Sequence, residues 1–280
     1  MRRTLPLFFA LTVGAAQAST GVIINKPSAE YTLEAGQSFT GSVQVISPVT
    51  EVGQNMLVEV RADDFLLKLD GDAVYSRAGS HLRSATRWLN LEASSFNLPP
   101  QGAREVRYTV QVPAGTPAGG YWGVLFFKGV TPPPPVTKSA AEGFKANIIY
   151  NIEIGHVIYV RVGNPVVRGE ITALKASLKE GKPNVAFTVK NTGNIFWRTA
   201  GSVSIVDLKT GQAVAKQALL GKLVLPGTPD PQDATRSNGY SRSLELDFAN
   251  ALPTGDYRVI LSLELERGRS VEDQTDLKVE

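Results

Sequence analysis

The chain consists of short segments in which apolar and polar residues alternate, and most of these segments end at glycine, proline or other turn-forming residues. A period of two is typical of β-strands that present one face to a core and the other to solvent. The segments are rich in Val, Ile, Thr and aromatic residues, which favour strands. The clearest of them are 39–46, 57–61, 105–112, 121–127, 185–190, 203–206 and 257–265.

One segment, 171–178 (ITALKASL), fits both a helix and a strand. Ile171, Leu174 and Leu178 recur at helical spacing, whereas Thr172, Leu174, Ala176 and Leu178 recur at a period of two. We interpret the segment as a strand because its neighbours are strands. Many short strands separated by turns, in a chain with 26 Gly and 17 Pro, predict an antiparallel β-sandwich.

Two pairs of similar segments occur in the same order in the two halves of the chain. The turns 34–37 (EAGQ) and 179–182 (KEGK) each lead into a strand. Further along, the corners 117–121 (PAGGY) and 253–257 (PTGDY) each lead into another strand. A Pro/Gly corner that ends in Tyr suits the place where a sandwich chain crosses between sheets, since the Tyr hydroxyl can bond to the loop backbone.

The weak repeat and the length of 280 residues predict two domains. We expect an all-β protein with two tandem Ig-like antiparallel β-sandwich domains, residues 19–163 and 164–280. The division falls near Gly163-Asn164-Pro165, which follows a long strand and cannot easily continue it.

The first 18 residues have the pattern of a cleaved secretory signal peptide. Arg2 and Arg3 precede an apolar run at 5–13, and Ala16-Gln17-Ala18 is a small-residue cleavage site. The alternative, a membrane anchor, needs about 20 apolar residues. No later segment is apolar enough to cross a bilayer, so we expect a protein without a transmembrane segment that is periplasmic or secreted.

Composition argues against most catalytic chemistry. The chain has no Cys and only two His, so Cys nucleophiles and Cys-ligated metals are excluded. No nucleophile-elbow or S-x-x-K motif is present. The net charge of +3, with 29 basic and 26 acidic residues, is too small and scattered to favour nucleic acid. We therefore expect a non-enzymatic protein with no cofactor and no metal.

Two polar features have alternative interpretations. Asp63-Asp64 and Asp70-Gly71-Asp72 could supply carboxylates to calcium, but Asp-Gly between two strand-like runs is the preferred composition of a tight hairpin turn, which we favour. His81 and His156 are far apart in the sequence. His156 has the apolar phase of a strand, so we expect it to be a satisfied core or interface histidine.

The most informative stretch follows the strand that ends at Phe127. A Pro-rich loop, 129–143, precedes 147–162 (NIIYNIEIGHVIYVRV), in which every even position but one is apolar and the other is a histidine. At about 3.3 Å per residue this run exceeds an ordinary sandwich, so part should overhang or bend, with Gly155 as the bend. The run is either a strand buried between its own sheets or an edge that a partner strand can extend.

Segments 88–91 (WLNL), 95–102 (SFNLPPQG) and 106–127 (VRYTVQVPAGTPAGGYWGVLFF) resemble the first domain of two bacterial envelope groups. One is the PapD-like periplasmic pilus chaperones, which have two Ig-like domains and a long loop before a hydrophobic last strand. The other is the WxL-interacting surface proteins, whose two Ig-like modules bind peptidoglycan and protein partners. The resemblance covers most of residues 21–162.

Each resemblance implies a partner. The chaperone group implies a protein client, a pilus or other envelope subunit, and a basic pair in the interdomain cleft, for which Lys26 and Arg161 are the candidates. We expect the client to bind by strand addition. The residues expected to contact it are Ile148, Ile149, Tyr150, Ile152 and Ile154.

The surface-protein group implies instead a structural envelope or peptidoglycan-binding role. Aromatic side chains that stack on sugars would serve such a role, although a place in the sandwich core is the alternative for each of them. The candidates are Trp88, Tyr121, Trp122 and Trp197.

The cleavage site leads to a direct prediction. The exported protein should begin at Ser19, because the small residues at Ala16 and Ala18 fit a signal peptidase site. Intact-mass measurement of the exported protein checks this, and a mass that retains residues 1–18 would contradict it.

Overall fold

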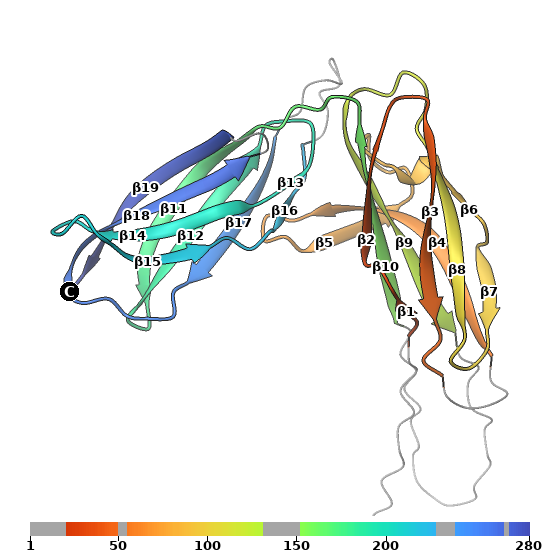
Figure 1. Cartoon of the computed structure of the whole chain (residues 1–280), viewed down its shortest axis with the longest axis horizontal. Coiled ribbons are helices and arrows are strands. Elements are labelled where there is room, and N and C mark those ends of the chain that lie inside the picture. The colour runs from red at the N-terminus through yellow and green to blue at the C-terminus, as the bar shows by residue number, and fades with distance from the viewer. Residues whose placement is uncertain (1–20, 50–54, 131–151, 228–238, 266–268) are drawn as a thin grey trace, which may run out of the picture.

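The computed structural model describes residues 21–49, 55–130, 152–227, 239–265 and 269–280 (Figure 1). The predicted signal peptide, 1–18, and most of the Pro-rich loop lie outside these residues. Within them the only helical element is one 3-10 turn, η1 (Thr86–Trp88). None of the described residues forms a helix long and apolar enough to cross a membrane.

The regular structure is otherwise all strand, as predicted, and forms two antiparallel sandwiches. The segment 171–178, which also fitted a helix, is part of a strand. The strands of the first sandwich are β1 (Ile23–Ile24), β2 (Ser28–Leu33), β3 (Ser38–Ile46), β4 (Met56–Leu67), β5 (Ala73–Arg77), β6 (Leu89–Leu91), β7 (Ser95–Leu98), β8 (Ala103–Gln111), β9 (Gly119–Val130) and β10 (Glu153–Val162). Those of the second are β11 (Gly169–Lys179), β12 (Lys182–Asn191), β13 (Trp197–Arg198), β14 (Ala200–Asp207), β15 (Ala213–Ala218), β16 (Leu223–Val224), β17 (Tyr240–Asp247), β18 (Gly255–Leu265) and β19 (Arg269–Val279).

In the first sandwich one sheet has the order β1-β3-β8-β6 and the other the order β2-β10-β9-β4-β5, with β7 also paired to β4. The chain changes sheets between its first two strands. β1 pairs with β3 antiparallel, whereas β2 runs parallel to β10, with Ser28 opposite Val157. The turn at 34–37 therefore crosses between sheets. The matching turn at 179–182 closes the β11–β12 hairpin instead.

In the second sandwich β11-β12-β17 faces β15-β14-β18-β19, and the short pair β13-β16 lies beside them. Its apolar core continues into the first sandwich. Trp122, Val124 and Tyr159 of the first sandwich join the same cluster as Phe196 and Trp197 of the second. The rings of Tyr159 and Phe196 are 4.9 Å apart between centroids. Burial of this apolar surface holds the two sandwiches together.

Both predicted tyrosine corners are formed. The Tyr121 hydroxyl donates a hydrogen bond of 2.9 Å to the Pro117 carbonyl, and the Tyr257 hydroxyl donates one of 2.8 Å to the Pro253 carbonyl. Each bond spans the same four positions and joins the start of an inner strand to the loop before it. The repeated corners 117–121 and 253–257 therefore have the same structure in both sandwiches.

The Asp70-Gly71 turn closes the β4–β5 hairpin, as predicted. The loop is longer than the expected two residues, because the Lys68 amide donates to the Asp72 carbonyl and leaves Leu69, Asp70 and Gly71 outside the ladder. Gly71 has φ +94°, which favours glycine at this point of a three-residue loop. In Figure 1 the hairpin extends from the first sandwich toward the second.

The hairpin tip contacts the second sandwich through two hydrogen bonds. The Leu69 carbonyl accepts a bond of 2.8 Å from the Ser243 amide, and the Lys68 carbonyl accepts one of 3.1 Å from the Tyr240 hydroxyl. The β4–β5 hairpin is therefore part of the junction between the sandwiches.

The tyrosine corners give a matched pair of variants. Tyr121→Phe and Tyr257→Phe should each lower the free energy of unfolding by about 1–2 kcal/mol, because each leaves a loop carbonyl without its donor. Denaturant titration of the two variants measures the effect. A loss near zero for both would show that the corner hydroxyls do not hold the loops.

Candidate functional site

The strand predicted to bind a partner is β10, which lies between β2 and β9 (Figure 1). Its pairing with β9 runs without a register shift from Glu153 opposite Lys128 to Val162 opposite Gly119. The sequence also allowed a bulge at Gly155, and the continuous register shows that none is formed there. Gly155 instead leaves space for its neighbours, since a Cβ there would lie 3.0 Å from a methyl carbon of Val124 and 3.3 Å from the Phe126 ring.

Only part of the outer edge of β10 is covered by β2. The β2 ladder covers Val157 to Val162, and the Val157 amide also donates to the Pro27 carbonyl. In an antiparallel pair the backbone groups of alternate residues point to opposite sides. The amide and carbonyl groups of Gly155 and Glu153 therefore point away from β9, like those of Val157. No described strand pairs with the edge there.

The burial of the side chains also changes along the run. Ile158 and Val160 are fully buried in the first core, and Ile154 packs against it while partly buried. Ile152 is 44% exposed. Ile148, Ile149 and Tyr150 lie outside the described residues. The half of the run beside β2 is thus core, whereas Ile152, its first described residue, is exposed on the side away from Gly21.

His156 lies at the boundary between these halves, fully buried and hydrogen-bonded. One ring nitrogen, Nδ1, is 2.8 Å from the Lys26 carbonyl, so Nδ1 carries the proton. Nε2 then accepts from the Tyr108 hydroxyl at 2.9 Å, and that oxygen accepts from the Tyr31 hydroxyl at 2.7 Å. This chain ties β2, β8 and β10 together. Burial lowers the pKa of His156, opposed by the bond to Lys26, and raises the pKa of Tyr108.

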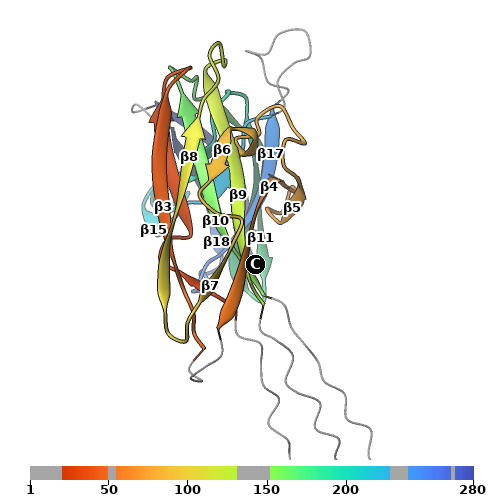
Figure 2. The same ribbon diagram turned by 90° about the vertical axis from the view of Figure 1, so that its right-hand side faces the viewer.

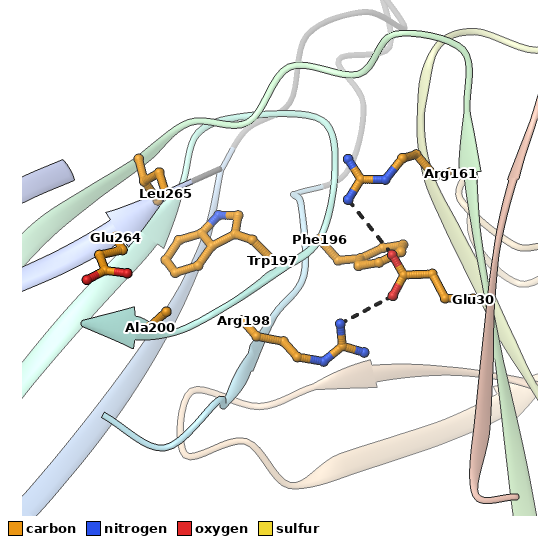
Figure 3. Close-up of a pocket in the computed structure, with 8 residues that line it drawn as sticks. All are labelled: Glu30, Arg161, Phe196, Trp197, Arg198, Ala200, Glu264 and Leu265. Atoms are coloured by element: carbon orange, nitrogen blue, oxygen red, sulfur yellow. Dashed lines mark hydrogen bonds and ion pairs between the residues drawn. The ribbon is translucent and has the colours of Figure 1, made fainter. Parts of the chain in front are cut away.

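The second candidate site is a cavity of about 330 Å³ between the two sandwiches (Figure 3). Glu30 of β2 lies between two arginines there, 3.8 Å from Arg161 of β10 and 3.3 Å from Arg198 of β13. Arg198 also lies over the Tyr159 ring, 5.5 Å from its centroid. One carboxylate of the chain itself thus lies between the two basic residues of this cleft and offsets part of their charge.

The two predicted cleft residues are not brought together. Arg161 lines the cavity, whereas Lys26 is not among the lining residues and its carbonyl bonds to His156. The second basic residue is Arg198, which sequence reasoning missed. Arg198 follows the aromatic pair Phe196-Trp197, and only the tertiary arrangement places it opposite Glu30.

A buried polar cluster beside the cavity was also missed. Arg83 is almost fully buried and reaches the second sandwich, where its Nε donates to the Gly227 carbonyl at 3.0 Å. Burial lowers the pKa of Arg83 to about 10. Asn194 of the second sandwich donates in return to the Ala118 carbonyl at 2.9 Å. These bonds link the domains without any motif that a sequence scan would recognise.

The loop that carries Arg83 is held by a buried carboxylate. Asp64 is fully buried and accepts hydrogen bonds from the Ser84 hydroxyl at 2.7 Å, the Thr86 hydroxyl at 2.8 Å and the Ser80 amide at 2.7 Å. The His81 ring lies 3.9 Å from the same carboxylate. Burial lowers the pKa of His81. Asp64 therefore orders the loop and is not an exposed calcium ligand.

The aromatic residues considered for sugar stacking belong to the core. Tyr121, Trp122 and Trp197 are buried, and Trp88 packs against Tyr121 with 4.5 Å between ring centroids. The Trp122 indole nitrogen donates to the Phe65 carbonyl at 2.7 Å. Among the described residues, no group of three or more His, Asp or Glu side chains is arranged to hold a metal ion.

The fold and site thus define a protein of two Ig-like sandwiches, in the first of which part of the last strand's outer edge pairs with no described strand. No family model matches the chain. No curated protein matches it either.

Solved structures similar to the chain include three fimbrial chaperones, the group that the sequence resembles. The class 5 fimbriae chaperone CfaA is 14% identical, with a TM-score of 0.46 and coverage of 90% of this chain and 98% of that one. The E. coli chaperone DraB is 14% identical, with a TM-score of 0.39 and coverage of 92% and 96%. The Salmonella enterica SafA pilin–SafB chaperone complex is 14% identical, with a TM-score of 0.39 and coverage of 92% and 95%.

The buried histidine leads to a pH prediction. Because burial lowers the pKa of His156 in the folded chain, the unfolded chain binds a proton first, near its ordinary pKa of about 6.5. The free energy of unfolding should therefore be level above that pH and decrease as pH falls below it. His81 contributes in the same direction.

Denaturant titrations between pH 5 and 8 test this. The His156→Gln variant retains an acceptor for Tyr108 and should show a smaller decrease than the wild type, although its stability at neutral pH is also lower. If the two pH profiles are parallel, His156 does not couple folding to protonation.

Proposed function

We propose that the chain is an exported, non-enzymatic, chaperone-like protein that binds pilus or other envelope subunits by β-strand addition. The observation that supports this most directly is the outward-facing backbone of Glu153 and Gly155, next to the exposed side chain of Ile152. A row of unpaired donors and acceptors beside apolar side chains is the feature that strand addition uses.

The ladder between β2 and β10 begins at Val157. In the proposed complex the client strand pairs with the outer edge of β10 before that point, next to the chain's own Gly21, which lies against Ile152. Main-chain hydrogen bonds to Glu153 and Gly155 supply affinity, and side chains of the run enter pockets of the incomplete client sheet. The proposed contact residues are Ile148, Tyr150, Ile152 and Ile154, with Ile149 on the opposite face.

The other end of β10 suits this role less well. β2 already pairs with Val157 to Val162, and Glu30 occupies the position between Arg161 and Arg198 that a client carboxylate would need. A client held at the cleft would have to displace Glu30. We therefore place client binding at the end of the first sandwich that lies away from the second.

The remaining assignments follow from the same proposal. We assign residues 1–18 to a signal peptide, 19–163 and 164–280 to the two domains, and the periplasm or the extracellular space as the location. The peptidoglycan-binding alternative relied on four aromatic residues that the fold uses in its interior, so we do not propose it.

A pair of aspartate substitutions tests strand addition. Ile152→Asp should weaken client capture by at least tenfold and leave the unfolding midpoint nearly unchanged, because that side chain is already 44% exposed. Val160→Asp should unfold the first domain, since the fully buried position loses roughly 1.5–3 kcal/mol of apolar burial and gains an unpaired buried charge.

Leu208→Asp is the matched control, because Leu208 has the same 44% exposure but lies in the second sandwich. Capture is measured with tagged protein and an envelope extract, and the captured subunits are identified by mass spectrometry. The proposal is wrong if Ile152→Asp and Leu208→Asp capture the same subunits equally, or if wild type captures none.

A further inference from the structure

The β4–β5 hairpin carries a second open strand edge that the proposed function does not use. β5 is the last strand of its sheet, and in Figure 2 it lies at the outer margin of the first sandwich. All of its residues except Ser76 are exposed. Edge strands are normally protected by charges or proline, yet Ala73, Val74 and Tyr75 form its first three positions.

The direction of the β5 backbone follows from the registers of the sheet. Val157 pairs with Val124 and points its backbone toward β2, so Val124 points toward β4 and bonds to Asp63. Because the backbone groups of Asp63 point toward β9, its pair with Arg77 of β5 is a non-hydrogen-bonded pair. The backbone groups of Arg77 therefore point away from β4. By alternation the amide and carbonyl groups of Ala73 and Tyr75 point outward. No described strand pairs with that edge.

We propose that two copies of this chain associate through an antiparallel β5–β5 pair with Val74 on the two-fold axis. In this register Ala73 of one copy hydrogen-bonds with Tyr75 of the other, on each side of the axis. A register centred on Tyr75 would need the Arg77 carbonyl, which already accepts from the Ser80 amide at 3.2 Å.

The side chains are complementary in this register. Leu66 and Val74 are directly opposed in the hairpin, and they are 44% and 47% exposed. Pairing across the axis places the Val74 side chains of both copies in contact, with a Leu66 beyond each. The result is one continuous apolar row on that face.

The charges at the two ends of β5 are also opposite. Arg77 is exposed at one end, and the exposed carboxylates of Asp70 and Asp72 flank Gly71 at the other. The antiparallel register places Arg77 of each copy opposite Gly71 of the other, beside Asp70 and Asp72. Lys68 lies 4.0 Å from Asp72 and Arg242 lies against Gly71, so these two cations offset part of the negative charge at that end. A parallel arrangement would bring like charges together instead.

A crosslink tests the register, because the natural chain has no cysteine. In a non-hydrogen-bonded antiparallel pair the Cα atoms are about 4.5 Å apart, within the range that a disulfide spans. Val74→Cys should therefore form a covalent dimer under mild oxidation. Val214→Cys is the matched control, on the edge strand β15 with 46% exposure, and should remain mostly monomeric.

Sedimentation measures the non-covalent dimer. Wild type should dimerise with rising concentration, and Val74→Lys should weaken the dimer at least tenfold while Val214→Lys does not. Arg77→Asp should also weaken it, and the combination of Asp72→Arg with Arg77→Asp should recover most of the loss.

Either of two results would overturn the proposal. One is a wild-type chain that stays monomeric up to several hundred micromolar. The other is equal crosslinking of Val74→Cys and Val214→Cys. Ile152→Asp should leave the dimer intact, so failure of client binding and failure of dimerisation are separately observed.

Discussion

The parallel pairing of β2 with β10 determines what the first sandwich can do. Because the chain changes sheets after β1, the last strand of the domain is covered by its own first segment, but only from Val157 onward. No described strand pairs with the remainder of that edge. The same pairing brings Glu30 beside Arg161, and so offsets part of the positive charge in the cleft between the sandwiches. β2 thus pairs with one end of β10, and no described strand pairs with the outer edge of the other end.

The junction between the sandwiches combines apolar burial with polar contacts that need both domains. Tyr159 packs on Phe196, and Arg83 reaches the Gly227 carbonyl from a loop that Asp64 orders. Removing a partner from such a buried network costs more than losing an exposed ion pair, because the remaining group stays desolvated. The ion pairs of the exposed cleft contribute less, since water competes with each of them.

Local patterns predicted the fold class because each of them depends only on residues that are close together in the sequence. Period-two alternation identified the strands, Asp70-Gly71 the hairpin, and Pro-x-Gly-x-Tyr corners the loops that Tyr121 and Tyr257 hold. The apolar phase of His156 predicted its burial. Each of these signals is contained within a few positions of the chain, where backbone sterics and burial act directly.

The site was less predictable because it depends on register and on contacts between distant residues. No pattern shows that the ladder between β2 and β10 begins at Val157, or that Arg198 of the second domain lies opposite Glu30 while Lys26 does not. Gly155 was expected to bend the strand, because a glycine in a strand commonly marks a bulge. Here it makes space for Phe126 and Val124, which only the packed neighbours reveal.

The sheet change after β1 also affects the order in which the domain can be assembled. β2 and β10 come from opposite ends of the first domain, so their ladder requires closure of a loop that contains nearly all of its other strands. Contacts between such distant segments are formed slowly, because the chain entropy of closure is lost before the contacts stabilise the structure. During synthesis, β10 is also the last of these strands to leave the ribosome. The edge at Glu153 and Gly155, with which no described strand pairs, therefore exists only once the rest of its domain is complete, and an unfinished chain cannot present it.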